Sequence, residues 1–155
     1  MSSIPQNKII KIAAVRATKV EQVQNIDADF VTVDVMADLH SFKNVDKKLI
    51  GVSRKINNWP FLKQMVDQDF YGVLCTSDEI KRALQWCPQL KRVLVVAETK
   101  DGYKVKMDDQ RWKNYPGEEY KTNNADFFFV EDKTNVNFEV LEDLEWYFEG
   151  CEVIV

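Results

Sequence analysis

The sequence predicts a single α/β domain with a mostly parallel sheet of six or seven strands joined by crossover helices. Three apolar runs within residues 49–98, LIGV, FYGVL and RVLVVAE, alternate with two helix-like segments. Connections of that length are too long for hairpins and are typical of parallel strands. The spacing is compatible with an open sheet or with a reduced β/α barrel, although a full barrel usually takes about 250 residues.

The first part of the chain predicts two more strands and one short helix. Residues 9–15, IIKIAAV, are an apolar run expected of a strand with both faces covered. Residues 29–35, DFVTVDV, predict the second strand. Between them, Thr18 precedes Glu21 at the spacing of a capping box, in which side chains satisfy free amide groups at a helix start. Residues 36–48 are less regular, and we expect a loop or a short helix there.

The two central helices carry start and stop signals. Pro60 falls in the first turn of the first helix, where the missing backbone donor costs nothing. Thr76 and Glu79 have capping-box spacing at the start of the second helix, which we expect to end at Pro88.

The alternation breaks at residues 99–123, which form an irregular insertion rich in aromatic and charged side chains. Asp101 and Gly102 are a turn signal, so a small hairpin is expected where the insertion begins. Beyond the insertion we expect a strand at 126–130, a helix at 138–149 and a last strand at 151–155.

Composition favours a soluble, cytoplasmic protein of one domain. The chain has 155 residues, of which 45% are hydrophobic and 30% charged, close to globular averages. No apolar run is long enough for a membrane span, and the N-terminal residues do not follow the order of an export signal. The net charge is −4, and nine acidic residues stand against Lys133 alone in residues 124–155. We therefore expect a solvated acidic helix near the C-terminus and disfavour nucleic acid as a partner.

Several common chemistries are disfavoured. The three cysteines, Cys75, Cys87 and Cys151, are odd in number and form no Cys-x-x-Cys pair, which argues against a disulfide framework or a zinc site. His40 is the only histidine, so a site with several histidine ligands is excluded. The glycine-rich signatures of the common nucleotide-binding loops are absent from the sequence.

Polar side chains follow the predicted strands. If those strands are parallel, their carboxyl ends share one rim, where ligands bind in open α/β sheets and barrels. We expect one half of this rim to bind an anion such as phosphate through Arg16, Arg54 and Lys55, helped by Thr76 and Ser77 at a helix start.

The other half of the rim is acidic. Asp34, Glu98 and Glu131 are candidate catalytic residues, because a carboxyl group can act as a general acid or base if burial raises its pKa. Asp34, Glu131 and Asp132 are candidate ligands for a divalent cation, which prefers oxygen donors. No other cofactor is indicated.

Two functions follow from these patterns, and the sequence leaves open whether the protein is an enzyme. The first is an enzyme or binding protein for an anionic, phosphorylated small molecule at the carboxyl ends of the strands. The alternative is a non-catalytic protein-interaction or assembly module that uses the acidic C-terminal helix and the aromatic insertion. The aromatic residues of the insertion are Tyr103, Trp112, Tyr115 and Tyr120.

Overall fold

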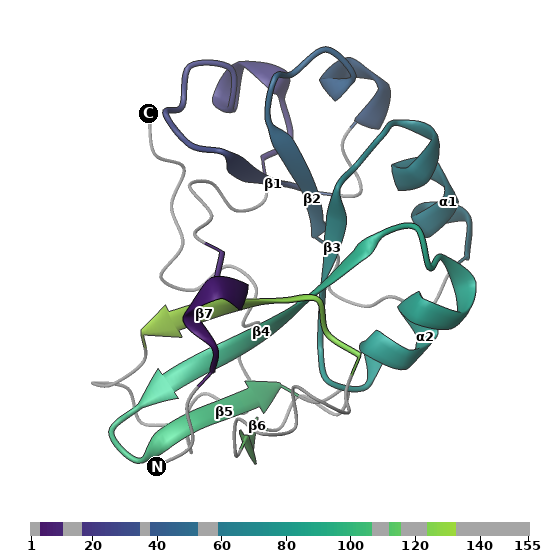
Figure 1. Cartoon of the computed structure of the whole chain (residues 1–155). Helices are drawn as coiled ribbons and strands as arrows, with labels where there is room; N and C mark the ends of the chain where they lie inside the picture. The colour runs from purple at the N-terminus through teal and green to yellow at the C-terminus, as the bar shows by residue number, and fades with distance from the viewer. Residues whose placement is uncertain are drawn as a thin grey trace.

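The computed structural model describes residues 4–10, 17–34, 38–52, 59–106, 112–115 and 124–132. It contains a mixed sheet of seven strands (Figure 1). The strands are β1 (Phe30–Asp34), β2 (Lys48–Val52), β3 (Gly72–Cys75), β4 (Lys91–Thr99), β5 (Gly102–Lys106), β6 (Trp112–Tyr115) and β7 (Phe127–Asp132). The helices are α1 (Trp59–Asp67), α2 (Glu79–Trp86) and the short 3₁₀ segments η1 (Gln6–Lys8), η2 (Val20–Gln22) and η3 (Leu39–Phe42).

Five of the strands run in one direction. β1 pairs with β2, β2 with β3, β3 with β4 and β4 with β7, each time in parallel. The helix α1 lies in the connection from β2 to β3, and α2 lies in the connection from β3 to β4. Both helices lie on the same side of these strands (Figure 1).

The prediction of a mostly parallel α/β sheet with crossover helices, open or closed as a reduced barrel, is wrong. The sheet is mixed, and the described residues contain only two α-helices. The reason lies in β4, which has nine residues while β3 has four. Strand β7 pairs along residues 93–98 of one edge of β4. Two strands therefore share the opposite edge of β4. Strand β3 pairs with residues 91–94 in parallel, and β5 pairs with residues 96–99 in the antiparallel direction.

The hairpin between β4 and β5 confirms the predicted turn. Thr99 pairs with Gly102, so Lys100 and Asp101 form the loop. Gly102 has a φ of +123°, a conformation that side-chain-bearing residues rarely adopt. The Thr99 hydroxyl donates to the carbonyl of Gly102 at 2.9 Å and accepts from the amide of Asp101 at 3.1 Å. Strand β6 then extends this antiparallel part beyond β5.

The N-terminal part of the chain contacts both outer strands of the parallel set. The Ile10 amide donates to the Phe128 carbonyl of β7 at 3.0 Å. The Ala17 amide donates to the Thr32 carbonyl of β1 at 3.1 Å, and the Asp34 amide donates to the Ala17 carbonyl at 2.8 Å. Most of the strand predicted at residues 9–15 lies outside the described residues.

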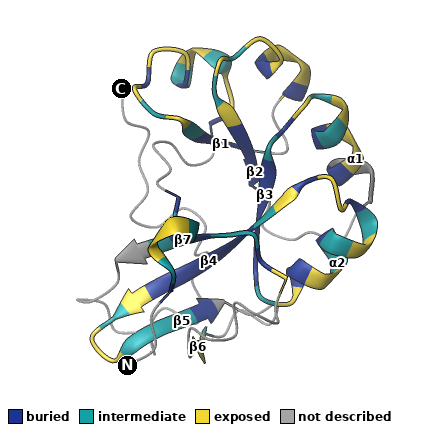
Figure 2. Cartoon of the chain, viewed as in Figure 1, coloured by how far each residue is buried: buried dark blue, intermediate teal, exposed yellow. Residues whose placement is uncertain are grey.

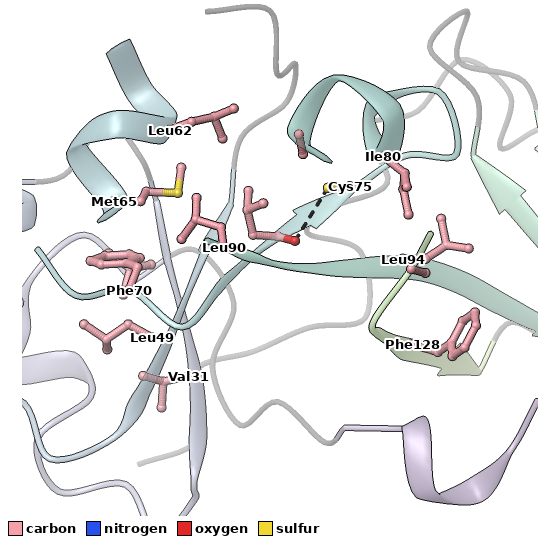
Figure 3. Packing of buried hydrophobic residues seen from close by; sticks show 14 of the residues in the cluster. Val31, Leu49, Leu62, Met65, Phe70, Cys75, Ile80, Leu90, Leu94 and Phe128 are labelled. Carbon is pink, nitrogen blue, oxygen red and sulfur yellow. Dashed lines mark hydrogen bonds between the residues drawn. The ribbon is translucent and has the colours of Figure 1, made fainter. Parts of the chain in front are cut away.

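Residues of the parallel strands alternate between two apolar clusters, so both faces of this part of the sheet are largely buried (Figure 2). One cluster joins the strands to the inner faces of α1 and α2 (Figure 3). It includes Val31, Leu49, Val73, Leu94 and Phe128 from the strands, with Leu62, Met65, Ile80 and Ala83 from the helices. The second cluster includes Ile50, Val52, Leu74, Val93, Val95 and Phe129. No helix in the described ranges is long and apolar enough to cross a membrane.

Candidate functional site

The rim predicted at the carboxyl ends of the strands is described only in part. Arg16, Arg54 and Lys55 lie outside the described residues. Glu131 and Asp132 belong to β7, and only their backbone is described. The remaining candidates are Asp34 at the end of β1, Thr76 and Ser77 after β3, and Glu98 in β4.

Thr76 and Glu79 form the predicted reciprocal pair of hydrogen bonds. The Thr76 amide donates to Glu79 Oε1 at 2.7 Å, and the Glu79 amide donates to Thr76 Oγ1 at 3.2 Å. The two residues are 3% and 1% exposed. This capping box stabilises the start of α2, because it satisfies amide groups that the helix leaves free.

The register of the parallel strands separates the predicted acidic residues. Asp34 pairs with Val52, and the pairings through β2, β3 and β4 place it level with Phe127. Asp132 follows Phe127 by five positions in β7, which is roughly 16 Å along a strand. Glu98 pairs directly with Asp132. The fold thus brings the backbones of Glu98 and Asp132 together and leaves Asp34 apart from them.

No group of three His, Cys, Asp or Glu residues within the described ranges is arranged to hold a metal ion. The side chains of Glu131 and Asp132 are outside those ranges. The divalent-cation site and the catalytic roles of Asp34, Glu98 and Glu131 therefore stay predictions.

The aromatic residues of the insertion pack inward where they are described. Tyr115 is 3% exposed and lies 6.1 Å from the ring of Phe128, centroid to centroid. Tyr103 packs against the helix-side cluster, and Trp112 packs against the second cluster. Tyr120 and the predicted acidic helix at 138–149 lie outside the described residues.

A cavity of about 400 Å³ lies at the opposite ends of the parallel strands. Lys48 begins β2, Tyr71 directly precedes β3, and Lys91 begins β4, and all three line this cavity. The sequence prediction assigned the site to the carboxyl ends of the strands and did not place a cavity at this end. The available signal was the lysine that begins each of two buried apolar runs.

The floor of the cavity is apolar. Phe70 and Leu90 line it, and they are 6% and 1% exposed as members of the helix-side cluster. Figure 3 shows Phe70 with Met65 of α1 and Leu49 of β2. Val66, from the last turn of α1, completes the apolar part of the lining.

The turn after α1 places Asp69 at the wall of the cavity. The Phe70 amide donates to the Met65 carbonyl at 2.8 Å, and the Asp69 amide donates to the Val66 carbonyl at 3.0 Å. These two bonds are those of a Schellman motif, which requires a left-handed residue after the helix. Asp69 is that residue, with a φ of +60°. Its side chain is exposed and lines the cavity.

The three lysines of the lining have different surroundings. Lys47 donates from Nζ to the carbonyl oxygens of Ile26 and Ala28, and so fixes the loop before β1. The Lys48 ammonium lies 5.3 Å from the ring centroid of Phe30 and 5.0 Å from that of Tyr71.

Cation–π attraction positions the Lys48 ammonium beside the cavity, because both ring faces attract a positive charge. Lys91 is exposed, and its side chain makes no hydrogen bond or ion pair with any residue in the described ranges.

Tyr71 lines the cavity and packs against two other aromatic rings. Its ring lies 5.7 Å from that of Phe30 and 5.9 Å from that of Phe127. Burial, and secondarily the carboxylate of Asp126, raises the pKa of the Tyr71 hydroxyl. This hydroxyl therefore keeps its proton at neutral pH and can donate a hydrogen bond.

The arginine nearest this edge is already paired. Arg92 Nη2 lies 2.9 Å from Asp126 Oδ2, and the same oxygen accepts from the Arg92 amide at 2.9 Å. Arg92 Nε also donates to the Asn124 carbonyl at 2.9 Å. These contacts hold the start of β4 against β7. The cations that line the cavity are therefore the lysines.

The lining thus combines three ammonium groups, one carboxylate and the amide of Gln89 around an apolar floor. Its volume falls within the range of roughly 300 to 1,000 Å³ that is common for small-molecule sites. An excess of positive charge attracts an anion. No family model matches the chain, and no curated protein matches its sequence.

Proposed function

We propose that the protein binds a small anionic molecule, one that carries a phosphate group, in the cavity at the amino ends of β2, β3 and β4. The observation that carries this proposal is the excess of lysine over carboxylate in a lining with an apolar floor. The class of ligand is the one expected from the sequence, but the location is at the other end of the strands. The proposed activity is binding, and no catalytic step is assigned.

The different surroundings of the three lysines support this proposal. Lys47 is held by backbone carbonyls and shapes the wall, whereas Lys48 and Lys91 have no anionic partner in the described ranges. A phosphate between them would receive charge-assisted hydrogen bonds. The Tyr71 hydroxyl and the Gln89 amide supply neutral donors beside the two ammonium groups.

Isothermal titration calorimetry with pyrophosphate and with propyl phosphate tests the proposal. The double variant Lys48→Ala/Lys91→Ala should weaken binding by at least about tenfold, since each charge-assisted hydrogen bond contributes about 1.5 to 3 kcal/mol. The matched control is Lys100→Ala/Lys113→Ala, which removes the same charge from two exposed lysines of the antiparallel part. This control should bind as the unmodified protein does.

Two results would contradict the proposal. One is that neither compound binds the unmodified protein or raises its melting temperature, since any ligand that binds only the folded state must stabilise it. The other is an equal loss of affinity in both double variants, because that would mean attraction by overall charge and not by this cavity.

A further inference from the structure

We infer that the ligand of the amino-end cavity also carries a positively charged amino group, which the carboxylate of Asp69 binds. This inference rests on the proposed function and narrows its ligand class from phosphate compounds in general to short zwitterions that join a phosphate to an amine. Asp69 then determines specificity, while Lys48 and Lys91 supply the attraction for the phosphate.

The first observation is that opposite charges line one cavity without neutralising each other. Asp69 shares the lining with Lys48 and Lys91. Its carboxylate makes no ion pair or hydrogen bond with any residue in the described ranges.

By contrast, two other acids near this edge of the sheet are paired. Asp67 binds Lys63 at 3.3 Å, and Asp126 binds Arg92 at 2.9 Å. A ligand that bears both charges can engage the Asp69 carboxylate and the lysines at once.

The second observation is the backbone of Asp69. A φ of +60° is less favourable for aspartate than for glycine, and the left-handed position of a Schellman motif is most often glycine. Glycine would relieve that cost and leave the cavity without a carboxylate. The side chain of Asp69 thus adds no hydrogen bond or ion pair to the turn within the described ranges, which is consistent with a role toward a ligand.

The third observation is the size and polarity of the site. A cavity of about 400 Å³ holds more than one phosphate group. The apolar floor formed by Phe70 and Leu90 suits a short methylene linker between the two charged ends. A bare anion would leave both this floor and the carboxylate unused.

The test compares two isosteric probes, O-phosphoethanolamine and propyl phosphate, which differ in having an ammonium or a methyl group at the end. Calorimetric titration should show about tenfold tighter binding of the amine to the unmodified protein, as expected for one charged hydrogen-bonded pair. Asp69→Asn should abolish this preference and retain the affinity for propyl phosphate. Asparagine tolerates the left-handed backbone, so the variant keeps the turn.

The matched control is Asp67→Asn. Asp67 is exposed, precedes Asp69 by two positions and does not line the cavity, so this variant removes the same charge outside the site. This variant should keep the preference for the amine. Equal binding of the two probes by the unmodified protein would overturn the inference and leave the proposed function standing. A preference that persists in Asp69→Asn would overturn the assignment to Asp69. Failure of both probes to bind would overturn the proposed function, and this inference with it.

Discussion

The two ends of the parallel strands differ in what their polar side chains do. At the carboxyl end, Thr76 and Glu79 are buried and hydrogen-bond each other at the start of α2. At the amino end, Lys48, Lys91 and Asp69 are exposed in a cavity and form no ion pairs with the described residues. Polar residues therefore stand at both ends, but among the described residues the lysines that line a cavity are at the amino end. We expect substitutions at the first end to change stability and substitutions at the second to change binding.

The largest effect on stability is expected at the carboxyl end. Glu79→Ala removes a buried capping carboxylate and leaves the Thr76 amide without this partner, which should cost about 2 to 3 kcal/mol of unfolding free energy. Urea unfolding measures this cost, and Glu98→Ala at an exposed position provides the control. Pyrophosphate affinity of the folded variant should be unchanged. If Glu79→Ala lost pyrophosphate affinity without losing stability, the carboxyl end would be the binding end, which contradicts our assignment.

A dependence of stability on alkaline pH is also expected at the end of β3. Burial, followed by the nearby Glu79 carboxylate, raises the pKa of the Cys75 thiol well above its ordinary value of 9.0. Above pH 9.0 the unfolded chain loses this proton while the folded chain keeps it. The unfolding free energy should therefore fall as the pH rises, by up to about 1.4 kcal/mol per pH unit for this group.

Cys75→Val keeps an apolar side chain of similar size. Chemical denaturation between pH 9 and 10.5 should show that the unfolding free energy of this variant falls with pH less steeply, by about 1 kcal/mol per pH unit. The slope will not vanish, because burial also raises the pKa of the Cys87 thiol. An unchanged slope in the Cys75 variant would mean that this thiol is not shielded from water.

The middle of β1 provides a reference between the two ends of the strands. Thr32 in β1 is fully buried, and its hydroxyl has no hydrogen-bond partner in the described ranges. Thr32→Val replaces this hydroxyl by a methyl group of the same shape, so it should raise the unfolding free energy by about 1 kcal/mol. Thermal unfolding would show the increase. A decrease of similar size would reveal a partner for the hydroxyl.

The smallest effect on stability is expected at the amino end. Asp69→Gly relieves the left-handed backbone after α1 and should stabilise the protein by about 0.5 to 1 kcal/mol. The same variant should lose its preference for O-phosphoethanolamine over propyl phosphate. A stabilised variant that still prefers O-phosphoethanolamine would show that the Asp69 carboxylate does not determine ligand specificity.

Local patterns in the sequence predicted the elements that depend on neighbouring residues. The apolar runs located β2, β3 and β4, the helix signals located α1 and α2, and Asp101 with Gly102 located the hairpin turn. The capping pair of Thr76 and Glu79 was also correct. Each of these features is decided within a few residues.

The arrangement of the sheet and the cavity could not be predicted in this way. An apolar run such as RVLVVAE shows that a strand is buried, but not that β3 and β5 share one edge of it. The cavity joins Lys48, Asp69 and Lys91, which are far apart in the sequence, through the register of three strands and the turn after α1. A lysine before a strand is typical of a solvated surface, so the lysines that begin two of the apolar runs were too weak a signal to group these residues.

A titration of the ¹⁵N-labelled protein with propyl phosphate, followed by amide chemical shifts, would distinguish the two ends most directly. We expect saturable shifts at Lys48, Phe70, Tyr71 and Lys91, which line the cavity, and none at Asp34, Thr76 or Ser77. Saturable shifts confined to Asp34, Thr76 and Ser77 would place the ligand at the carboxyl ends and contradict the assignment of the site to the amino end.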